Sequence, residues 1–146
     1  MREILFRAKR KNWRELSKEE WWVEGNLITN ERQEGTAYIG YIFDVHNGVI
    51  EDFDIVEVDP ETLCQFTGML DKNGERIWEN DIVSAWSEGK YATGKVKQRI
   101  DGLYIIYPAY QHNEFWGLCP DKNRKTNVEV IGNIFYGGIN GQGTEE

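Results

Sequence analysis

The sequence predicts a mainly β fold, because tight-turn dipeptides, alternating runs and scarce helix signals all favour it. Asn47-Gly48, Asn73-Gly74 and Asp101-Gly102 each lie between two apolar runs. Such dipeptides are the strongest short-range signal for a β-hairpin. The runs beside them alternate between apolar and polar residues, as strands with one buried face do. We therefore expect antiparallel strands joined by short turns.

The carboxyl-terminal half predicts five short antiparallel strands that follow one another as a meander. Pro108 ends the third strand, because proline cannot donate to a ladder. In the second strand, small and apolar residues alternate with a polar, long-stemmed set that we expect to face solvent. The strands are expected near residues 82–87, 91–100, 103–107, 115–118 and 128–136, and the solvent-facing set is Tyr91, Thr93, Lys95, Lys97 and Arg99.

Helix signals are few. Asp59-Pro60-Glu61 combines an N-cap acceptor, a proline at the first helical position and an acid near the positive end of the dipole. It predicts one short helix through about Gln65, with Gly68 available to end it. Residues 17–20 predict a single turn before a strand at 21–28. These elements divide the chain into a β-rich extension with a basic arm and a hairpin (1–58), a core (59–136) and a flexible glycine-rich tail (137–146).

Length and composition limit the classes of protein that this chain can be. A chain of 146 residues and 17.1 kDa fits one domain with at most a small appended lobe. Its longest apolar stretch, 103–110, is far shorter than the roughly 20 residues of a membrane helix. The charged amino terminus fits no secretory signal, so we expect a cytoplasmic location. Cys64 and Cys119 are expected to be reduced thiols.

The charge of the chain is unevenly distributed. The formal net charge is −8. Residues 1–18 contain seven basic and two acidic residues, a local charge of +5 that leaves −13 for the remainder. A basic arm on an acidic body is consistent with nucleic-acid contact by the arm, with association of arm and body, or with no specific role. The acidic body argues against general binding to polyanions.

The polar stretch 65–83, QFTGMLDKNGERIWENDIV, resembles an active-site loop but is better explained as scaffold. Asp71 can accept hydrogen bonds from its own backbone two residues on, and Asn73 and Gly74 tolerate positive φ. Asp81 closes a cap at the start of the next strand. A calcium loop would need further oxygen ligands where Arg76 and Trp78 stand. We therefore predict a turn and no metal site.

The same stretch is similar to the signature of the YopX-like family of phage and prophage proteins, which reads Q-[FY]-T-G-L-x-D-K-N-G-x-x-I-[FY]-E-G-D-I-V. MREILFRAKR at the amino terminus resembles the family's M-R-E-I-x-F-R. Residues 22–27 resemble its W-V-x-G-x-L, and residues 130–134 its V-I-G-N-I. The resemblance covers about residues 1–136. Two positions depart from the pattern: Asn80 replaces the usual glycine, and Tyr136-Gly-Gly replaces the usual N-P-E-L.

The resemblance implies a small, strongly bent SH3-like barrel over residues 59–136 with a variable amino-terminal extension. It also implies a phage or prophage origin in a bacterial host, and it implies no enzymatic activity. The motif residues that we expect to shape this fold are Gly68, Asp71, Asn73, Gly74, Asp81 and Gly132.

Catalytic and cofactor-binding patterns are missing from the sequence. The chain contains two histidines, and its serines lie in no nucleophile-elbow context. No glycine-rich loop leads into a helix with a lysine, so we expect no cofactor, no metal and no enzyme activity. The acidic run 51–61 holds six carboxylates. It is read as a solvated edge strand or as a docking surface for a basic partner, with a metal-assisted nuclease as a minor third class.

Aromatic residues suggest function through contacts. Six Trp and seven Tyr exceed what a barrel of this size holds, and interfaces are enriched in both. The leading hypothesis is a non-catalytic accessory protein that works through protein–protein contacts, as a homo-oligomer or with a host or phage protein. The alternative is a nucleic-acid-binding module that uses the basic arm and the 91–99 strand, although the net charge disfavours it. The residues expected in contacts are Trp21, Trp22, Tyr104, Tyr107, Tyr110 and Trp116, and those expected on nucleic acid are Arg7, Lys9, Arg10, Lys11, Lys95, Lys97 and Arg99.

Overall fold

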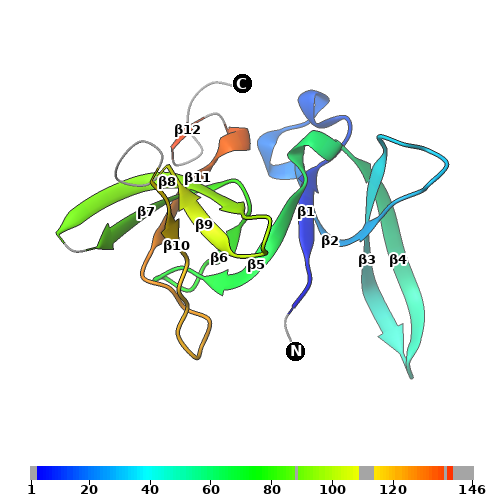
Figure 1. The fold of residues 1–146 in the computed structure, drawn as a ribbon. Helices are drawn as coiled ribbons and strands as arrows, with labels where there is room; N and C mark the ends of the chain where they lie inside the picture. The colour runs from blue at the N-terminus through cyan, green and yellow to red at the C-terminus, as the bar shows by residue number, and fades with distance from the viewer. Residues whose placement is uncertain (1–2, 88, 109–113, 137, 140–146) are drawn as a thin grey trace. The chain divides into compact units, whose positions relative to one another are not determined.

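The computed structural model describes residues 3–87, 89–108, 114–136 and 138–139 (Figure 1). The chain forms two compact units. Unit 1 runs from Glu3 to Gln65, and unit 2 begins at Phe66. The expected boundary at residues 58/59 precedes this division. Strand β5 (Cys64–Leu70) crosses it, beginning in unit 1 and continuing into unit 2.

Unit 1 is an antiparallel sheet in the order β4-β3-β2-β1. The first residues of β5 pair with the free edge of β1. The hairpin between β3 and β4 turns at Asn47-Gly48, with φ values of 52° and 78°, as the sequence predicts. The strands are β1 (Phe6–Lys9), β2 (Trp22–Ile28), β3 (Ala37–His46) and β4 (Val49–Val58).

Helix is confined to 3₁₀ turns in the described residues, and the predicted short helix is not confirmed. Asp59 does cap a turn by accepting from the Glu61 N–H at 3.1 Å. The turn ends after three residues because Cys64 already belongs to β5, so Gln65 and Gly68 are strand residues. The turns are η1 (Trp13–Glu15), η2 (Lys18–Glu20), η3 (Pro60–Thr62) and η4 (Ile134–Tyr136).

Unit 2 contains an antiparallel sheet in the order β10-β9-β8-β7-β11-β12, and β6 pairs with β5. The predicted meander is correct through β10, but β11 returns to pair with β7 on the other side. Neither sheet closes on itself, so the SH3-like barrel is not confirmed. The strands are β6 (Arg76–Trp78), β7 (Asp81–Ser87), β8 (Lys90–Gln98), β9 (Tyr104–Tyr107), β10 (Trp116–Gly117), β11 (Glu129–Asn133) and β12 (Gly138–Ile139).

Each unit has its own hydrophobic core. In unit 1, one face of the sheet buries Ala8, Val23, Ala37, Ile39 and Val58. In unit 2, the inner face of the sheet buries alternate residues of β7, β8 and β9, as the predicted alternation requires. That core comprises Met69, Ile77, Val83, Ala85, Val96, Tyr104, Ile106, Leu118 and Val128. Of the predicted tail, residues 138–139 form β12, and residues 137 and 140–146 lie outside the described residues.

Asp71 organises the turn in the central signature. Its side chain is 1% exposed. One carboxylate oxygen accepts from the backbone N–H groups of Asn73 (2.8 Å) and Glu75 (2.9 Å), and the other accepts from Val130 N–H on β11 (3.1 Å). Gly74 adopts a φ of 84° to close the turn. The carboxylate therefore satisfies three backbone donors, which is the scaffold role that the sequence predicts.

Asp81 forms a second buried connection. Its carboxylate accepts from the backbone N–H of Trp78 (2.8 Å) and from the side-chain amide of Asn133 (2.9 Å). Asn80 has a φ of 72°, so the asparagine that replaces the family's glycine keeps the left-handed conformation. Gly68 and Gly132 lie at the register shifts of β5 and β11, and Gly68 has a φ of 86°. The signature thus bends and joins strands.

The turn at Asp71 is repeated at Asp121. In Asp121-Lys-Asn-Arg124, the Asp121 carboxylate accepts from the N–H groups of Asn123 (2.8 Å) and Lys125 (3.0 Å), as Asp71 does for its own turn. Leu70 N–H donates to the Arg124 carbonyl at 2.7 Å, so the second loop lies beside the first. The repeat is hard to recognise in the sequence because Arg124 stands where the first turn has glycine, yet Arg124 adopts a φ of 66°.

Replacing Arg124 with glycine is expected to stabilise unit 2 by about 1 kcal/mol, because a left-handed conformation costs a residue with a Cβ about that much. The measurement is the free energy of unfolding from urea denaturation. The matched control is Gly74→Ala. The new Cβ would meet nothing within 4 Å, but the alanine would have to keep the φ of 84° of Gly74. It should lose about 1 kcal/mol. A loss of stability in Arg124→Gly would contradict this account.

Candidate interaction surface

The sheet of unit 1 has apolar residues on both faces. In antiparallel pairs, opposite residues point to the same side and alternate along each strand. Ile39 pairs with Val56 on the core side of the β3–β4 hairpin. Ile42 pairs with Phe53 on the other side. This second face, which we call the outer face, is formed by Ile28, Ile42, Val45, Ile50, Phe53 and Ile55.

All of the outer-face side chains are substantially exposed. They range from 39% exposed for Ile28 to 58% for Phe53. Five of the six also line a shallow apolar groove of about 230 Å³, whose floor includes Gly40. Single exposed apolar residues are ordinary, but a contiguous set marks an interaction surface. The outer face is such a set.

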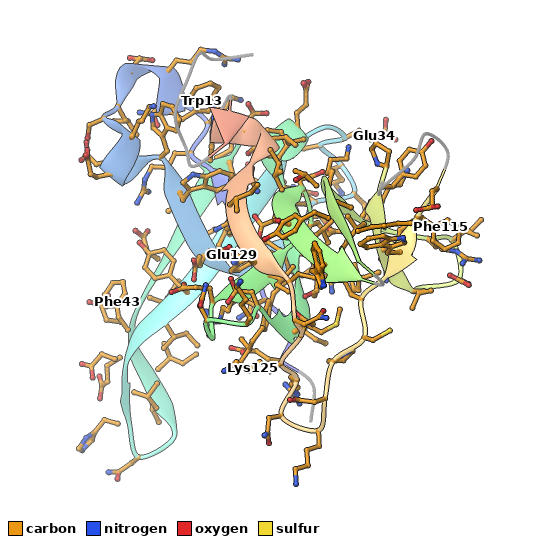
Figure 2. The ribbon with its side chains drawn as sticks, turned by 90° about the vertical axis from the view of Figure 1, so that its left-hand side faces the viewer. Trp13, Glu34, Phe43, Phe115, Lys125 and Glu129 are labelled. Carbon is orange, nitrogen blue, oxygen red and sulfur yellow. The ribbon has the colours of Figure 1, made fainter. Side chains whose placement is uncertain are left out.

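The part of the β3–β4 hairpin beyond Gly40 (residues 41–54), which we call the distal hairpin, carries acidic residues on its other side. Register shifts in the hairpin place Asp44 opposite Asp52, and Tyr41 opposite Asp54, away from the outer face. The Tyr41 hydroxyl donates to the Asp54 carboxylate at 3.2 Å, and the Tyr41 ring lies 5.6 Å from Phe43. Figure 2 shows Phe43 pointing away from the hairpin. One side of the distal hairpin is therefore apolar, and the other combines carboxylates with the rings of Tyr41 and Phe43.

The distal hairpin also projects from its sheet. Strand β2 pairs with β3 only at Tyr38, Ile39 and Gly40. In Figure 1 the rest of the hairpin extends past the end of β2. Strand β4 is at the edge of the sheet, which agrees with reading the acidic run 51–61 as a solvated edge. A projecting ribbon with one apolar side is well placed to meet another polypeptide.

The basic arm meets the acidic run within unit 1. Lys11 Nζ lies 2.9 Å from the Glu57 carboxylate, and this hydrogen bond and charge raise the pKa of Lys11. The Lys11 N–H donates to the Glu57 carbonyl at 3.1 Å. Of the roles that the sequence left open for the arm, association with the body is the one that these contacts show.

Lys9 is held in a box of tryptophans. Its side chain is 1% exposed, and its ammonium lies 3.8 Å from the centre of a Trp13 ring and 4.1 Å from that of Trp21. These two rings meet edge to face, 5.0 Å apart. A desolvated cation over aromatic faces gains about 2 kcal/mol or more per favourable contact. Lys9 therefore stabilises unit 1 and is not available to a phosphate.

The other arm residues predicted to bind nucleic acid also make contacts within unit 1. The Arg7 guanidinium lies 4.9 Å from the Trp22 ring centre. Arg10 Nε donates to the Glu20 carbonyl at 2.9 Å. The arm is thus a packed part of the fold. Lys95, Lys97 and Arg99 lie in unit 2, on β8 and just after it, where Lys95 is half-buried and the other two are exposed.

Three of the six aromatic residues predicted to form contacts pack in or against a core. Trp21 and Tyr104 are buried within their units, so neither side chain is on the surface. Trp116 packs against the core of unit 2 and donates to Glu114 at 3.0 Å. Trp22 and Tyr107 are half-buried, and Tyr110 lies outside the described residues. Other apolar side chains are exposed instead, among them Phe53 on the β3–β4 hairpin and Trp86 and Tyr91 in unit 2.

The described residues contain neither a candidate metal site nor a membrane-spanning helix. Within residues 3–87, 89–108, 114–136 and 138–139, no group of three or more His, Cys, Asp or Glu side chains could hold a metal ion. Across that same part of the chain, no helix has the length and apolar character needed to cross a membrane. Cys64 and Cys119 form no disulfide within the described residues; Cys64 is buried and Cys119 is exposed.

Sequence reasoning missed the outer face because alternation shows that a strand has an apolar side, not what covers it. The signal was present, because Phe53 and Ile55 recur through the acidic run. The structure places these two on the outer face and Val56 and Val58 on the core side.

Comparison with known proteins identifies the family. No curated protein and no solved structure matches the chain significantly. The family model described as YopX protein matches residues 5–137, which include the central signature, both buried aspartates and the hairpin. Because this match covers most of the chain, the protein belongs to the YopX family.

Proposed function

We propose that the protein is a non-catalytic phage or prophage accessory protein of the bacterial cytoplasm that works through protein–protein contacts as a homo-oligomer. The observation that carries the proposal is the exposed apolar outer face of the distal hairpin. An antiparallel sheet ordinarily buries one face and leaves the other polar. Here the second face is apolar as well, and a second copy of the same face would cover it.

The size of the outer face suits self-association. Six half-exposed side chains present on the order of 500 Å² of apolar surface. Two copies would bury about 1,000 Å², the lower end of specific interfaces, so we expect reversible association. Asp44 and Asp52 lie opposite each other on the other side of the hairpin. Asp54 borders the groove, and Glu57, on the outer side, is paired with Lys11. We expect these acids to weaken the association at low salt and to matter less as salt rises.

The buried aspartates of the central signature and the tryptophans around Lys9 support a non-catalytic role. Asp71 and Asp81, the two buried carboxylates of the central signature, accept hydrogen bonds from backbone and amide donors. Trp13 and Trp21 enclose Lys9. These contacts give each of the three side chains a structural role.

The chain offers a matched pair of variants to test self-association. Phe53 and Phe43 are 58% and 56% exposed, lie on the same hairpin and point to opposite sides. We expect Phe53→Ser to weaken self-association at least about 30-fold, as loss of a central aromatic anchor does. Phe43→Ser should change it by less than about threefold. Sedimentation velocity over a concentration series measures both.

Two results would count against the proposal. One is a wild-type protein that sediments as a monomer at every concentration. The other is equal weakening in both variants, which would show that the outer face has no special part in association. Far-ultraviolet circular dichroism of each variant shows that the fold is retained.

A further inference from the structure

We propose that the outward side of the β7–β8–β9 sheet in unit 2, here called the basic aromatic face, binds single-stranded nucleic acid. This goes beyond the proposed function and uses a different unit from the hairpin. The face is defined by strand register: Val83, Ala85 and Val96 point into the core, so their neighbours point outward. The exposed and half-buried side chains of the face are Ile82, Trp86, Tyr91, Thr93, Lys95, Lys97 and Tyr107. Ser84 and Ile105 point to the same side but are buried.

Two large aromatic residues on this face are exposed without an evident packing role. Trp86 and Tyr91 are 56% and 57% exposed and are directly paired across β7 and β8. Their ring centres lie 5.6 Å apart in an edge-to-face arrangement. Exposed aromatic rings on a sheet provide surfaces on which nucleic-acid bases stack, whatever the base sequence.

Cations lie beside these rings. Lys95 is directly opposite Tyr107, and Lys97 Nζ is 5.3 Å from the centre of the Tyr107 ring. Just after β8, the Arg99 guanidinium lies 5.1 Å from the ring centre of Phe115, which is itself exposed. From Tyr91 to Lys97 the strand spans roughly 20 Å. Rings and cations thus alternate along a length that fits a short stretch of single strand.

Two carboxylates limit the charge of the face. Asp101 pairs with Arg99 at 3.2 Å, and Glu129 stands opposite Ser84 on the neighbouring strand and lies 3.8 Å from Lys72. Neither pairs with Lys95 or Lys97. We therefore assign the phosphate contacts to these two lysines.

The net charge of −8 does not oppose this assignment, because the acids are concentrated in the other part of the chain. Residues 1–65 hold 14 acidic and 8 basic residues, whereas residues 66–146 hold 11 and 9. Unit 2 is thus close to neutral. Of the arm residues predicted to contact nucleic acid, Lys9 is enclosed by tryptophans. The inference concerns unit 2 alone.

The test is fluorescence anisotropy of a labelled oligothymidylate of about 12 nucleotides, a length within the site sizes of single-strand-binding domains. Wild-type protein should bind at about 50 mM salt and bind more weakly as salt rises. Trp86→Ala should lower the affinity at least about fivefold through lost stacking. The double variant Lys95→Gln/Lys97→Gln loses two phosphate contacts. The slope of log affinity against log salt should therefore become shallower by about 1.4.

The control is Lys122→Gln with Lys125→Gln, which removes the same charge from an exposed loop of the same unit. It should leave the affinity within about twofold, because long-range charge effects are screened by salt. No binding at about 50 mM salt would overturn the inference. So would equal weakening by the control, an unchanged affinity in Trp86→Ala, or equal binding of a duplex, whose stacked bases cannot reach the rings.

Discussion

Asp71→Ala is expected to lower the free energy of unfolding of unit 2 by about 3 kcal/mol or more. Three backbone N–H groups lose their acceptor in a site where Asp71 is 1% exposed. Each buried donor left without an acceptor costs about 1–3 kcal/mol. At about 4–8 °C per kcal/mol for a unit of this size, the midpoint of thermal unfolding should fall by at least about 12 °C.

Asp121→Ala is the control, because Asp121 accepts from the equivalent two N–H groups of the repeated turn but is exposed. Water can replace its carboxylate, so we expect a loss of about 1 kcal/mol. Equal losses in the two variants, measured by differential scanning calorimetry, would show that burial of Asp71 has no special effect.

Gly25→Ala is expected to destabilise unit 1 by about 3 kcal/mol, the upper part of the range for overpacking. Gly25 is the glycine of the family motif W-V-x-G-x-L. A Cβ built there would lie 2.3 Å from the carbonyl oxygen of Gly40 and 3.0 Å from Ile39 Cγ2. Because the nearest atom belongs to backbone, a paired strand would have to move.

Gly40→Ala provides the comparison within the same sheet. Its Cβ would lie 2.8 Å from Ile28 Cδ1, the flexible end of a side chain that can turn away. We expect a cost of less than about 1 kcal/mol. Chemical denaturation of both variants measures the difference. A Gly40→Ala variant that is less stable than Gly25→Ala would contradict the role given to the Gly25–Gly40 approach.

The sequence predicts the local chemistry of this fold well, because that chemistry depends on a few adjacent residues. The Asn47-Gly48 turn and the Asp71 turn form as predicted. The alternation around Ala92 and Val96 also gives the correct buried side of β8. In each case the signal and its structural consequence lie within about ten residues of each other.

The parts that could not be predicted depend on which distant segments meet. The return of β11 to β7, in place of a fifth meander strand, is a long-range pairing with no local signal. The burial of Lys9 depends on Trp13 and Trp21, which come from separate turns. The two sides of the hairpin both carry apolar residues, and only the paired strands show which side has a core.

The central claim is that a second copy covers the outer face of the β3–β4 hairpin. Hydroxyl-radical footprinting of the wild-type protein, read by mass spectrometry over a concentration series, tests it most directly. The account predicts that oxidation of Phe53 falls as concentration rises, while oxidation of Phe43, nearly as exposed on the opposite side, stays constant. Equal oxidation of both phenylalanines at every concentration would contradict it.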